Sequence, residues 1–421
     1  MDDLRDRLLA EMRAIRTVDC HSHTCLRRDY YAQGPRSLFD LMSYFERDLQ
    51  GVAGCTSAEL YADAVSDEER WNRLKRVIAS ARNVSYWRHN VTVYRELFGM
   101  VEPEVGDANW RALNRRIKSA TADPGWYEYV TSDVCGLETQ IRNIPWFEDW
   151  EPEYFTAVLR MEPALELHRP SPRQALEEHL HTSIEDLPGL KRALADLVEE
   201  YRMRGAVGIK LAHAYSRTLA CADVPEPEAA ALLRRALLGE ELSPAEAMLL
   251  QDHVVDYLAG LAGELGLVFQ IHTGVQTNWG HIPDSDPLLL LPLLRRHRST
   301  RFDLFHAGYP YSREIGMLGK HYPNVWLNMA WMYVVTMEGS RQTLKEWLDL
   351  VPGDRILGFG SDVGWPEFIH GHLVMARACL ADVLAEKVRE DFLSEEVAFD
   401  LARGLLRGNA MSLYGLGTES Q

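Results

Sequence analysis

The sequence lacks three features that would place a protein in a membrane, in a disulfide scaffold or on nucleic acid. It contains no run of about 20 apolar residues, the length needed to cross a bilayer. Its six cysteines are scattered without CxxC spacing, as expected for reduced thiols rather than a disulfide framework. Its 45 Lys and Arg are outnumbered by 62 Asp and Glu, which gives a net charge of −17. Clustered cations are what neutralise phosphates. We therefore expect a cytoplasmic protein that binds neither nucleic acid nor a membrane.

The N-terminal residues do not read as a targeting segment. The first twenty, MDDLRDRLLAEMRAIRTVDC, are charged and amphipathic, with no long apolar core and no small-residue cleavage site. The chain has 421 residues, of which 46% are hydrophobic and 25% are charged, as in ordinary globular proteins. The sequence thus predicts a folded protein with a large core.

The C-terminal half alternates short apolar runs with longer helical patterns, which is typical of βα units and a parallel sheet. Five runs are candidate strands: 206–212, 267–272, 302–306, 324–330 and 355–362. The N-terminal half supplies three more, at 16–21, 128–134 and 154–161. Eight strands are the number that closes a (β/α)8 barrel. The fold class we predict is therefore α/β, a TIM barrel.

The barrel is predicted to occupy residues 1–421 as a single domain with one large insertion. Residues 24–127, between the first two strands, are rich in Trp, Tyr and Arg and helical in pattern. An insertion at this point lies on a βα loop, so we expect a lid over the catalytic face. The alternative is an open doubly wound sheet, but that fold usually has a glycine-rich turn after its first strand. Here the first strand is followed by HSHT.

Six polar residues end five of the predicted strands, and in a parallel barrel these ends meet at one rim. They are His21 and His23, Lys210, His272, His306 and Asp362. His21 and His23 are two apart on an extended chain, so their side chains point to the same side. Imidazoles that converge with a carboxylate form a ligand set for a divalent ion such as zinc. Each residue also has a structural interpretation: a hydrogen-bonded core histidine, a helix N-cap for Asp362, or an anion-binding lysine for Lys210.

The motifs VDCHSH, IHTG, FHAGYP and GSD, at four of these strand ends, resemble the amidohydrolase superfamily. The nearest branch contains metal-dependent hydrolases, aromatic-acid decarboxylases and relatives of uronate isomerase. The C-terminal half is also similar to the amidohydrolase-like part of glutamine-synthetase fusion proteins. The long helical segment after the first strand and LRMEP at 159–163 resemble uronate isomerases.

This resemblance implies roles for the strand-end residues. His21, His23, His272 and Asp362 would be the metal ligands, with Asp362 also carrying protons. His306 would hold the attacking water or the substrate, and Lys210 would be catalytic, carbamylated in a two-metal site. We expect zinc as the cofactor, as one ion, with two as the alternative. Asp19 lies two residues before His21 and either orients that ring or forms a buried structural hydrogen bond.

The leading functional hypothesis is a metal-dependent hydrolase of an amide-type C–N bond in a small substrate that carries a carboxylate. The alternatives are a uronate-isomerase-like sugar isomerase, a non-oxidative decarboxylase, and a barrel whose metal is only structural. Candidates for binding the substrate are Arg28, Tyr309, Arg313 and Trp365. The partner is a small molecule, and a homo-oligomer is left open. Further histidines after strand ends, His213, His281, His370 and His372, are candidates for lining the pocket.

Overall fold

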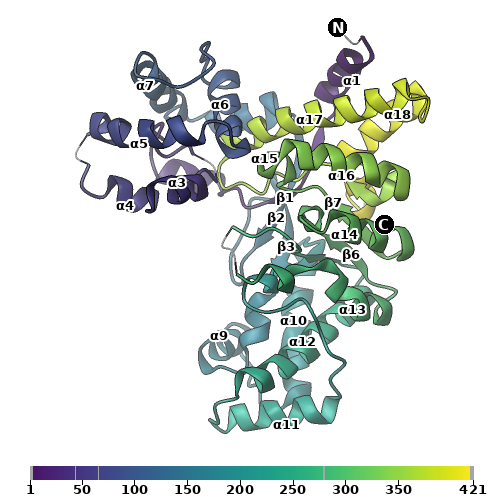
Figure 1. Ribbon diagram of the computed structural model, residues 1–421. Coiled ribbons are helices and arrows are strands. Elements are labelled where there is room, and N and C mark those ends of the chain that lie inside the picture. Colours follow the sequence, from purple (N-terminus) through teal and green to yellow (C-terminus); the bar gives the residue numbers. More distant parts are fainter. Residues whose placement is uncertain (1–2, 43, 65, 278–279, 418–421) are drawn as a thin grey trace. The chain divides into compact units, whose positions relative to one another are not determined.

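The core of the protein is a sheet of eight strands whose spatial order is their order in the chain (Figure 1). The computed structural model describes residues 3–42, 44–64, 66–277 and 280–417. β2 to β8 pair in parallel, and helices follow the strands. The predicted (β/α)8 barrel is therefore confirmed. The strands are β1 Thr17–Ser22, β2 Leu137–Ile144, β3 Phe155–Arg160, β4 Gly208–Leu211, β5 Val268–Ile271, β6 Arg301–Leu304, β7 Val325–Asn328 and β8 Ile356–Leu357.

The central strands are short and buried on both faces, which explains why they read as continuous apolar runs rather than alternating ones. Every residue of β4 (GIKL) and β5 (VFQI) is buried. The few polar residues within these strands lie side by side: Lys210 is paired in register with Gln270, and Gln270 with Asp303. Buried polar groups need hydrogen-bond partners, and Asp303 receives bonds from Tyr414 Oη (2.5 Å) and Asn328 Nδ2 (3.0 Å).

The chain divides into two compact units. The first contains residues 1–138, 330–345 and 358–407, and the second contains residues 139–329, 346–357 and 408–421. β1 belongs to the first unit, and β3 to β8 belong to the second. The description of the chain as one domain stays a prediction.

Helices of the first unit precede β1, fill the stretch between β1 and β2, and follow β7 and β8. They are α1 Asp3–Ala14, α2 Arg27–Ala32, α3 Glu46–Ala53, α4 Ser57–Tyr61, α5 Asp67–Ala81, α6 Ser85–Glu96, α7 Trp110–Thr121, α8 Trp126–Glu128, α15 Met332–Val335, α17 Pro366–Arg389 and α18 Glu395–Arg403. The helical character predicted for residues 24–127 is thus confirmed. Their role as a lid stays a prediction.

The remaining α-helices follow strands of the second unit. They are α9 Pro170–Leu180, α10 Leu187–Met203, α11 Glu226–Leu237, α12 Pro244–Glu264, α13 Leu291–Arg296, α14 Ser312–His321, α16 Met337–Leu350, which runs across the residue boundary at 345, and α19 Asn409–Tyr414. Local signals set their ends: α12 begins with a capping box between Ser243 and Glu246 and has Pro244 in its first turn.

Two predicted elements differ from the structure. Residues 128–134 are predicted as the second strand, but Glu128 ends α8 and residues 129–134 form a π-helix (η1) that continues it. β2 begins only after Gly136, whose φ is 63°. The β-branched residues of this segment gave a strand-like pattern, but the left-handed turn at Gly136 is what starts the extended chain. The helical pattern from Ser394 to Tyr414 predicts one helix, but a π-helical turn, Gly404–Gly408, divides it into α18 and α19.

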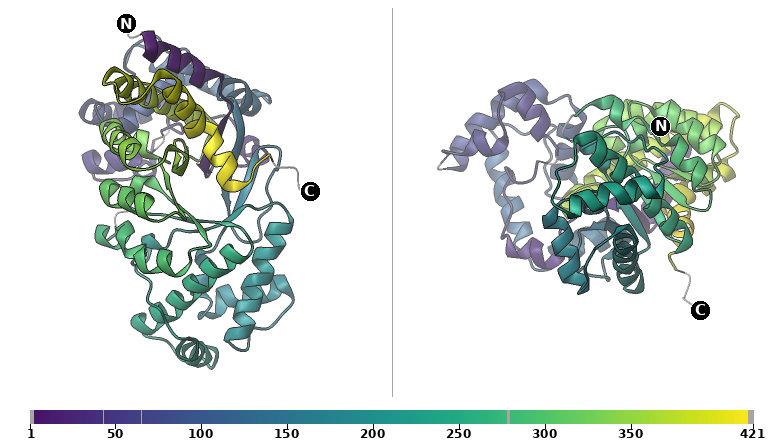
Figure 2. Two further views of the ribbon diagram at one scale, coloured as in Figure 1. Left: turned by 90° about the vertical axis from the view of Figure 1, so that its right-hand side faces the viewer. Right: turned by 90° about the horizontal axis from the view of Figure 1, so that it is seen from below.

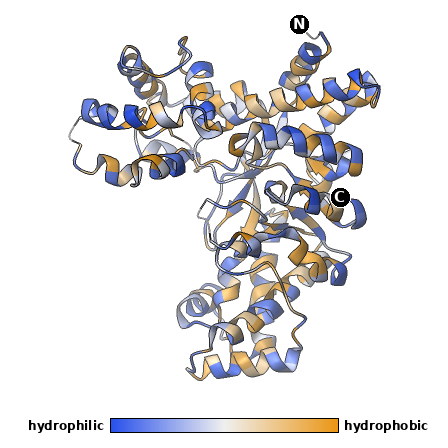
Figure 3. Ribbon diagram, in the orientation of Figure 1, coloured by the Kyte–Doolittle hydropathy of each residue, from blue (hydrophilic) through white to orange (hydrophobic). Residues whose placement is uncertain are grey.

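Helix α17 is the long core helix of the first unit. By length and composition it could cross a membrane, but 83% of its most apolar window is buried inside the protein, and apolar residues recur along its length in Figure 3. It packs against α1 and α6, and α1 lies beside it in Figures 1 and 2. Gly371 permits the close packing of α17 against α6, since a Cβ at this position would lie 2.5 Å from Cγ2 of Val93 in α6. The helix begins at Pro366, four residues after Asp362, at the end of the loop that follows β8.

Candidate metal centre

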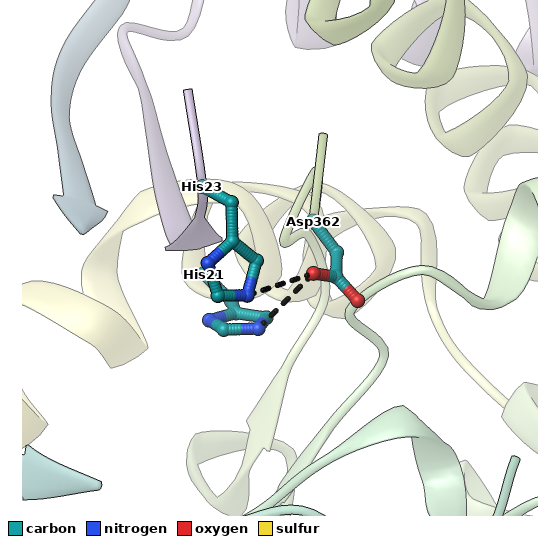
Figure 4. A group of neighbouring side chains, drawn as sticks. All are labelled: His21, His23 and Asp362. Atoms are coloured by element: carbon teal, nitrogen blue, oxygen red, sulfur yellow. Dashed lines mark ion pairs between the residues drawn. The ribbon is translucent and has the colours of Figure 1, made fainter. Parts of the chain in front are cut away.

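Three predicted ligands converge in the first unit: His21, His23 and Asp362 (Figure 4). Asp362 Oδ1 lies 3.2 Å from His21 Nε2 and 3.3 Å from His23 Nε2. One ligand atom from each residue lies within 4.8 Å of the other two. The His21 and Asp362 side chains are 2% and 10% exposed, whereas that of His23 is 40% exposed. The cluster therefore has a buried side and a side open to solvent.

The local backbone explains this convergence. His21 lies in β1 and His23 just after it, so the two-residue period of an extended chain puts both rings on one side. The rings meet edge to face with centroids 4.8 Å apart. Asp362 has a φ of 55°, a left-handed conformation that costs a non-glycine residue about 1 kcal/mol. Such strain persists only where neighbouring contacts impose it, and it is common at functional sites.

The chemistry of these donors fits a divalent metal ion. Two imidazole nitrogens and a carboxylate oxygen are a ligand set that zinc accepts, and catalytic zinc sites keep three protein ligands plus an open position. Without a cation, three such groups gathered around one point gain little beyond two histidine–carboxylate contacts. The trio is thus a candidate metal centre, and the identity of the ion as zinc stays a prediction.

Asp19 holds the backbone of this centre rather than a histidine ring. Its completely buried carboxylate accepts hydrogen bonds through Oδ1 from the backbone N–H of Ser361 (2.7 Å) and of His21 (3.3 Å). Burial raises the pKa of Asp19 to about 7. Of the two roles considered for Asp19, the structure favours the buried structural hydrogen bond, which ties the end of β1 to the loop after β8.

His272 and His306 come together in the second unit. His306 Nε2 lies 2.9 Å from His272 Nδ1, and His272 Nε2 lies 2.8 Å from Val275 O. A carbonyl oxygen can only accept, so His272 carries its proton on Nε2 and accepts from His306 through Nδ1. His306 has a φ of 61°, a second strained residue at a strand end. Both nitrogens of His272 are hydrogen bonded in this arrangement, so its role as the fourth ligand stays a prediction, as does the catalytic role of His306.

Lys210 is buried within β4, with 2% of the residue exposed, and its Nζ lies 3.4 Å from the centroid of the Phe305 ring. This is a cation–π contact. Its neighbour in register, Gln270, is itself paired with Asp303. Burial raises the pKa of Asp303 to about 7, while the nearby Lys210 charge lowers it. These contacts suit a lysine that balances a buried carboxyl group, and its carbamylation stays a prediction.

The four predicted substrate-binding residues have different surroundings. Arg313 lies on the surface, with 81% of its side chain exposed, and donates through Nε (2.9 Å) and Nη2 (2.6 Å) to Glu346. This favours a surface ion pair over substrate binding. The Arg28 side chain is 59% exposed, with Nε 3.9 Å from Asp29 Oδ1. Trp365 is partly buried, and Cζ of Arg36 lies 3.8 Å from the centroid of its ring. Tyr309 is partly buried just after β6. The binding roles of Arg28, Trp365 and Tyr309 stay predictions.

Tyr44 is a residue of the centre that the sequence analysis missed. Its hydroxyl donates to the backbone carbonyl of Asp362, and its ring lies 4.9 Å from that of Trp331 and 5.6 Å from that of Tyr86. Its φ of 56° aims the side chain, and no sequence motif records that angle. Only its place in an aromatic-rich insertion next to the metal motif could have pointed to it.

Known proteins resemble this chain over most of its barrel. The sequence profile of the family described as Amidohydrolase matches residues 181–416. Protein fluG of Emericella nidulans is 30% identical over 151 residues, which are 36% of this chain and 18% of that protein. Uronate isomerase of Sphingopyxis alaskensis is 31% identical over 218 residues, 47% of this chain and 46% of the enzyme. The chain thus aligns with less than half the length of these two relatives.

The fold has a close counterpart among solved structures. Uronate isomerase of Thermotoga maritima superposes with a TM-score of 0.82, covers 98% of each chain and is 16% identical. At that identity the match concerns the fold alone.

The comparisons correct the leading functional hypothesis. Several further sequence relatives are also named uronate isomerases, which contradicts the prediction of a hydrolase of C–N bonds and favours the isomerase alternative. The predicted superfamily is confirmed, since the matching profile covers more than half of the sequence. This chain belongs to the amidohydrolase family.

Proposed function

We propose that this protein is a metal-dependent isomerase that interconverts the aldose and ketose forms of a uronate. The observation that carries the proposal is the convergence of His21, His23 and Asp362 in a chain whose relatives are named uronate isomerases. Aldose–ketose isomerisation needs a polarised carbonyl and a group that moves protons between neighbouring atoms. The trio can supply both.

His21 and His23 would hold the ion, together with Asp362. When bound there, a divalent ion polarises the substrate carbonyl and acidifies the adjacent hydroxyl group. We propose one zinc ion, because the trio on its own makes a complete three-ligand set.

Asp362 would carry the proton. Its carboxylate is held by the contacts of Oδ1 with the two imidazoles, and the strained backbone fixes the direction from which it meets a substrate. The reaction takes a proton from C2 and returns one to C1, while the hydroxyl proton moves from O2 to O1. Atoms balance without water as a reactant. A positioned carboxylate contributes about 10²- to 10⁴-fold to such proton transfers.

Tyr44, which lies in the insertion between β1 and β2, would line the proposed metal centre. Because its hydroxyl donates to the Asp362 carbonyl, it keeps the loop after β8 in position while its ring forms a wall with Trp331. The carboxylate of the uronate requires a cation, and Arg28, with its exposed guanidinium, is our candidate.

The test is incubation of the zinc-loaded protein with glucuronate and galacturonate, with products identified by NMR and mass spectrometry. We expect a product of unchanged mass in H2O, a ketose by NMR, and loss of activity on chelation that added Zn²⁺ restores. The His21→Ala variant should be inactive with either substrate. A gain of 18 Da, a loss of 44 Da, or no turnover of either uronate by fully loaded protein would contradict the proposal.

A further inference from the structure

The loop that carries Asp362 has every backbone polar group of two consecutive residues bonded to a different partner. Ser361 N–H donates to Asp19 Oδ1 (2.7 Å), and Asp362 N–H donates to the carbonyl of His21 (2.8 Å). The Asp362 carbonyl accepts from Tyr44. The Ser361 carbonyl lies 3.0 Å from His372 Nδ1. The first three partners come from β1 and the insertion, whereas His372 lies on α17.

His372 is not a pocket residue, as its place after the eighth strand had suggested. It is completely buried, and its ring centroid lies 5.3 Å from that of Phe359, 5.7 Å from Tyr333 and 6.0 Å from His89. These three rings pack around the imidazole of His372. Because a carbonyl oxygen can only accept, the Nδ1 atom of His372 carries the proton and donates it.

The protonation state of His372 is compatible with a fixed structural donor. Burial, and then the neighbouring His89, lower the pKa of His372 to about 3. The ring is therefore neutral at physiological pH and offers the Ser361 carbonyl one N–H in a constant tautomer. The hydrogen bond and ring contacts of His372 are to Ser361, Phe359, Tyr333 and His89, and none is to the three ligands.

From this geometry we infer that His372 is a positioning residue for the metal centre: its Nδ1–H, presented by α17, fixes the Ser361 carbonyl and thereby holds the left-handed backbone that points Asp362 at His21 and His23. The inference rests on the metal centre of the proposed function. Residues that hydrogen-bond to metal ligands orient them in a similar way, and substitution of such residues commonly weakens metal binding about 10- to 100-fold. Here the orientation acts through the ligand's backbone and not through its side chain.

The position of the donor within the side chain allows a matched test. In His372→Asn the amide nitrogen takes the place of Nδ1, and in His372→Gln it takes the place of Nε2. Both variants therefore keep a buried primary amide. Only His372→Asn keeps an N–H donor within reach of the Ser361 carbonyl. His370→Gln is the control, because His370 lies on the same helix, is 8% exposed and has no bond to Ser361. Zn²⁺ affinity is measured by competition with a chromophoric chelator, and folding by circular dichroism and thermal melting of the metal-free protein.

We expect His372→Asn to bind Zn²⁺ within about threefold of the unmodified protein, as His370→Gln does, and His372→Gln to bind it about 10- to 100-fold more weakly. Equal affinities for the Asn and Gln variants, whether both high or both low, would overturn the inference. Unmodified protein that binds no Zn²⁺ would overturn it together with the metal centre. Protein that shows the expected order of affinities but isomerises no uronate would refute the proposed function alone.

Discussion

At Gly360 the loop after β8 passes close to Ala330 and to the backbone of His21 in β1. A Cβ at this position would lie 2.7 Å from Ala330 Cβ, 3.1 Å from Ala330 Cα and 3.2 Å from the backbone nitrogen of His21. Carbon atoms in good contact are about 3.5–4.0 Å apart. The Gly360→Ala substitution must therefore push backbone segments apart by about 1 Å, because none of these atoms belongs to a flexible side chain.

The displacement acts directly on the metal centre. Gly360 precedes Asp362 by two residues. The added Cβ would press mainly on Ala330 and also on the backbone nitrogen of His21, so we expect Asp362 and His21 to move relative to one another. Metal sites tolerate ligand displacements of only about 0.2 Å. We expect Gly360→Ala to weaken Zn²⁺ binding at least about tenfold and to lower the free energy of unfolding by about 1–3 kcal/mol, the usual cost of overpacking.

The measurements are chelator competition for Zn²⁺ and urea unfolding of the metal-free protein. The control is Gly364→Ala, four residues further on, where an added Cβ meets no atom within 4 Å. It should leave both quantities unchanged. Unaltered Zn²⁺ affinity in Gly360→Ala, or equal damage in the two variants, would refute the argument from close packing.

Three further substitutions test other parts of the account. Asp362→Asn should leave the thermal transition of the metal-free protein intact while slowing uronate isomerisation at least about 100-fold; near-normal turnover would exclude Asp362 as the proton carrier. Arg313→Ala should change KM less than twofold, since its guanidinium is bound by Glu346 and exposed pairs contribute about 0–1 kcal/mol; a tenfold rise in KM would restore Arg313 to the substrate site. Burial raises the pKa of Asp303 to about 7, so the folded protein keeps a proton that the unfolded chain releases above about pH 4, and stability should fall as the pH rises through this window. Urea unfolding at pH 5 and pH 8 should show that fall, and Asp303→Asn should reduce it; an identical pH dependence in the variant would contradict the shift.

The sequence was sufficient for the barrel and for the convergence of the trio, because both depend on short-range regularities. Alternating apolar runs and helical patterns predicted the strand order, and the two-residue spacing of His21 and His23 predicted rings on one side. Asp362 followed from its place after the eighth strand. The second strand was misplaced because β-branched residues also occur in the π-helix Tyr129–Val134.

Other features of the centre depend on conformations and distant contacts that no local pattern records. The reach of Tyr44 depends on a positive φ, and the bond from His372 depends on how closely α17 packs against the loop after β8. The prediction of the reaction class, hydrolysis of a C–N bond, was wrong for a related reason. The same ligands serve hydrolysis and isomerisation, and the side chains that decide between them come from loops whose shape the motifs do not encode.

The hydrogen bond from the Tyr44 hydroxyl to the Asp362 carbonyl joins the insertion to the proposed metal centre. If an ordered insertion raises the affinity of the centre for the ion, then the bound ion stabilises the ordered insertion by the same free energy, because linkage between two equilibria is mutual. Loading the ion should therefore protect the segment around Tyr44 from proteases, and cleavage there should release the ion. Substitutions in the helical insertion would then change the affinity of the centre for its ion, although the ligands stay the same.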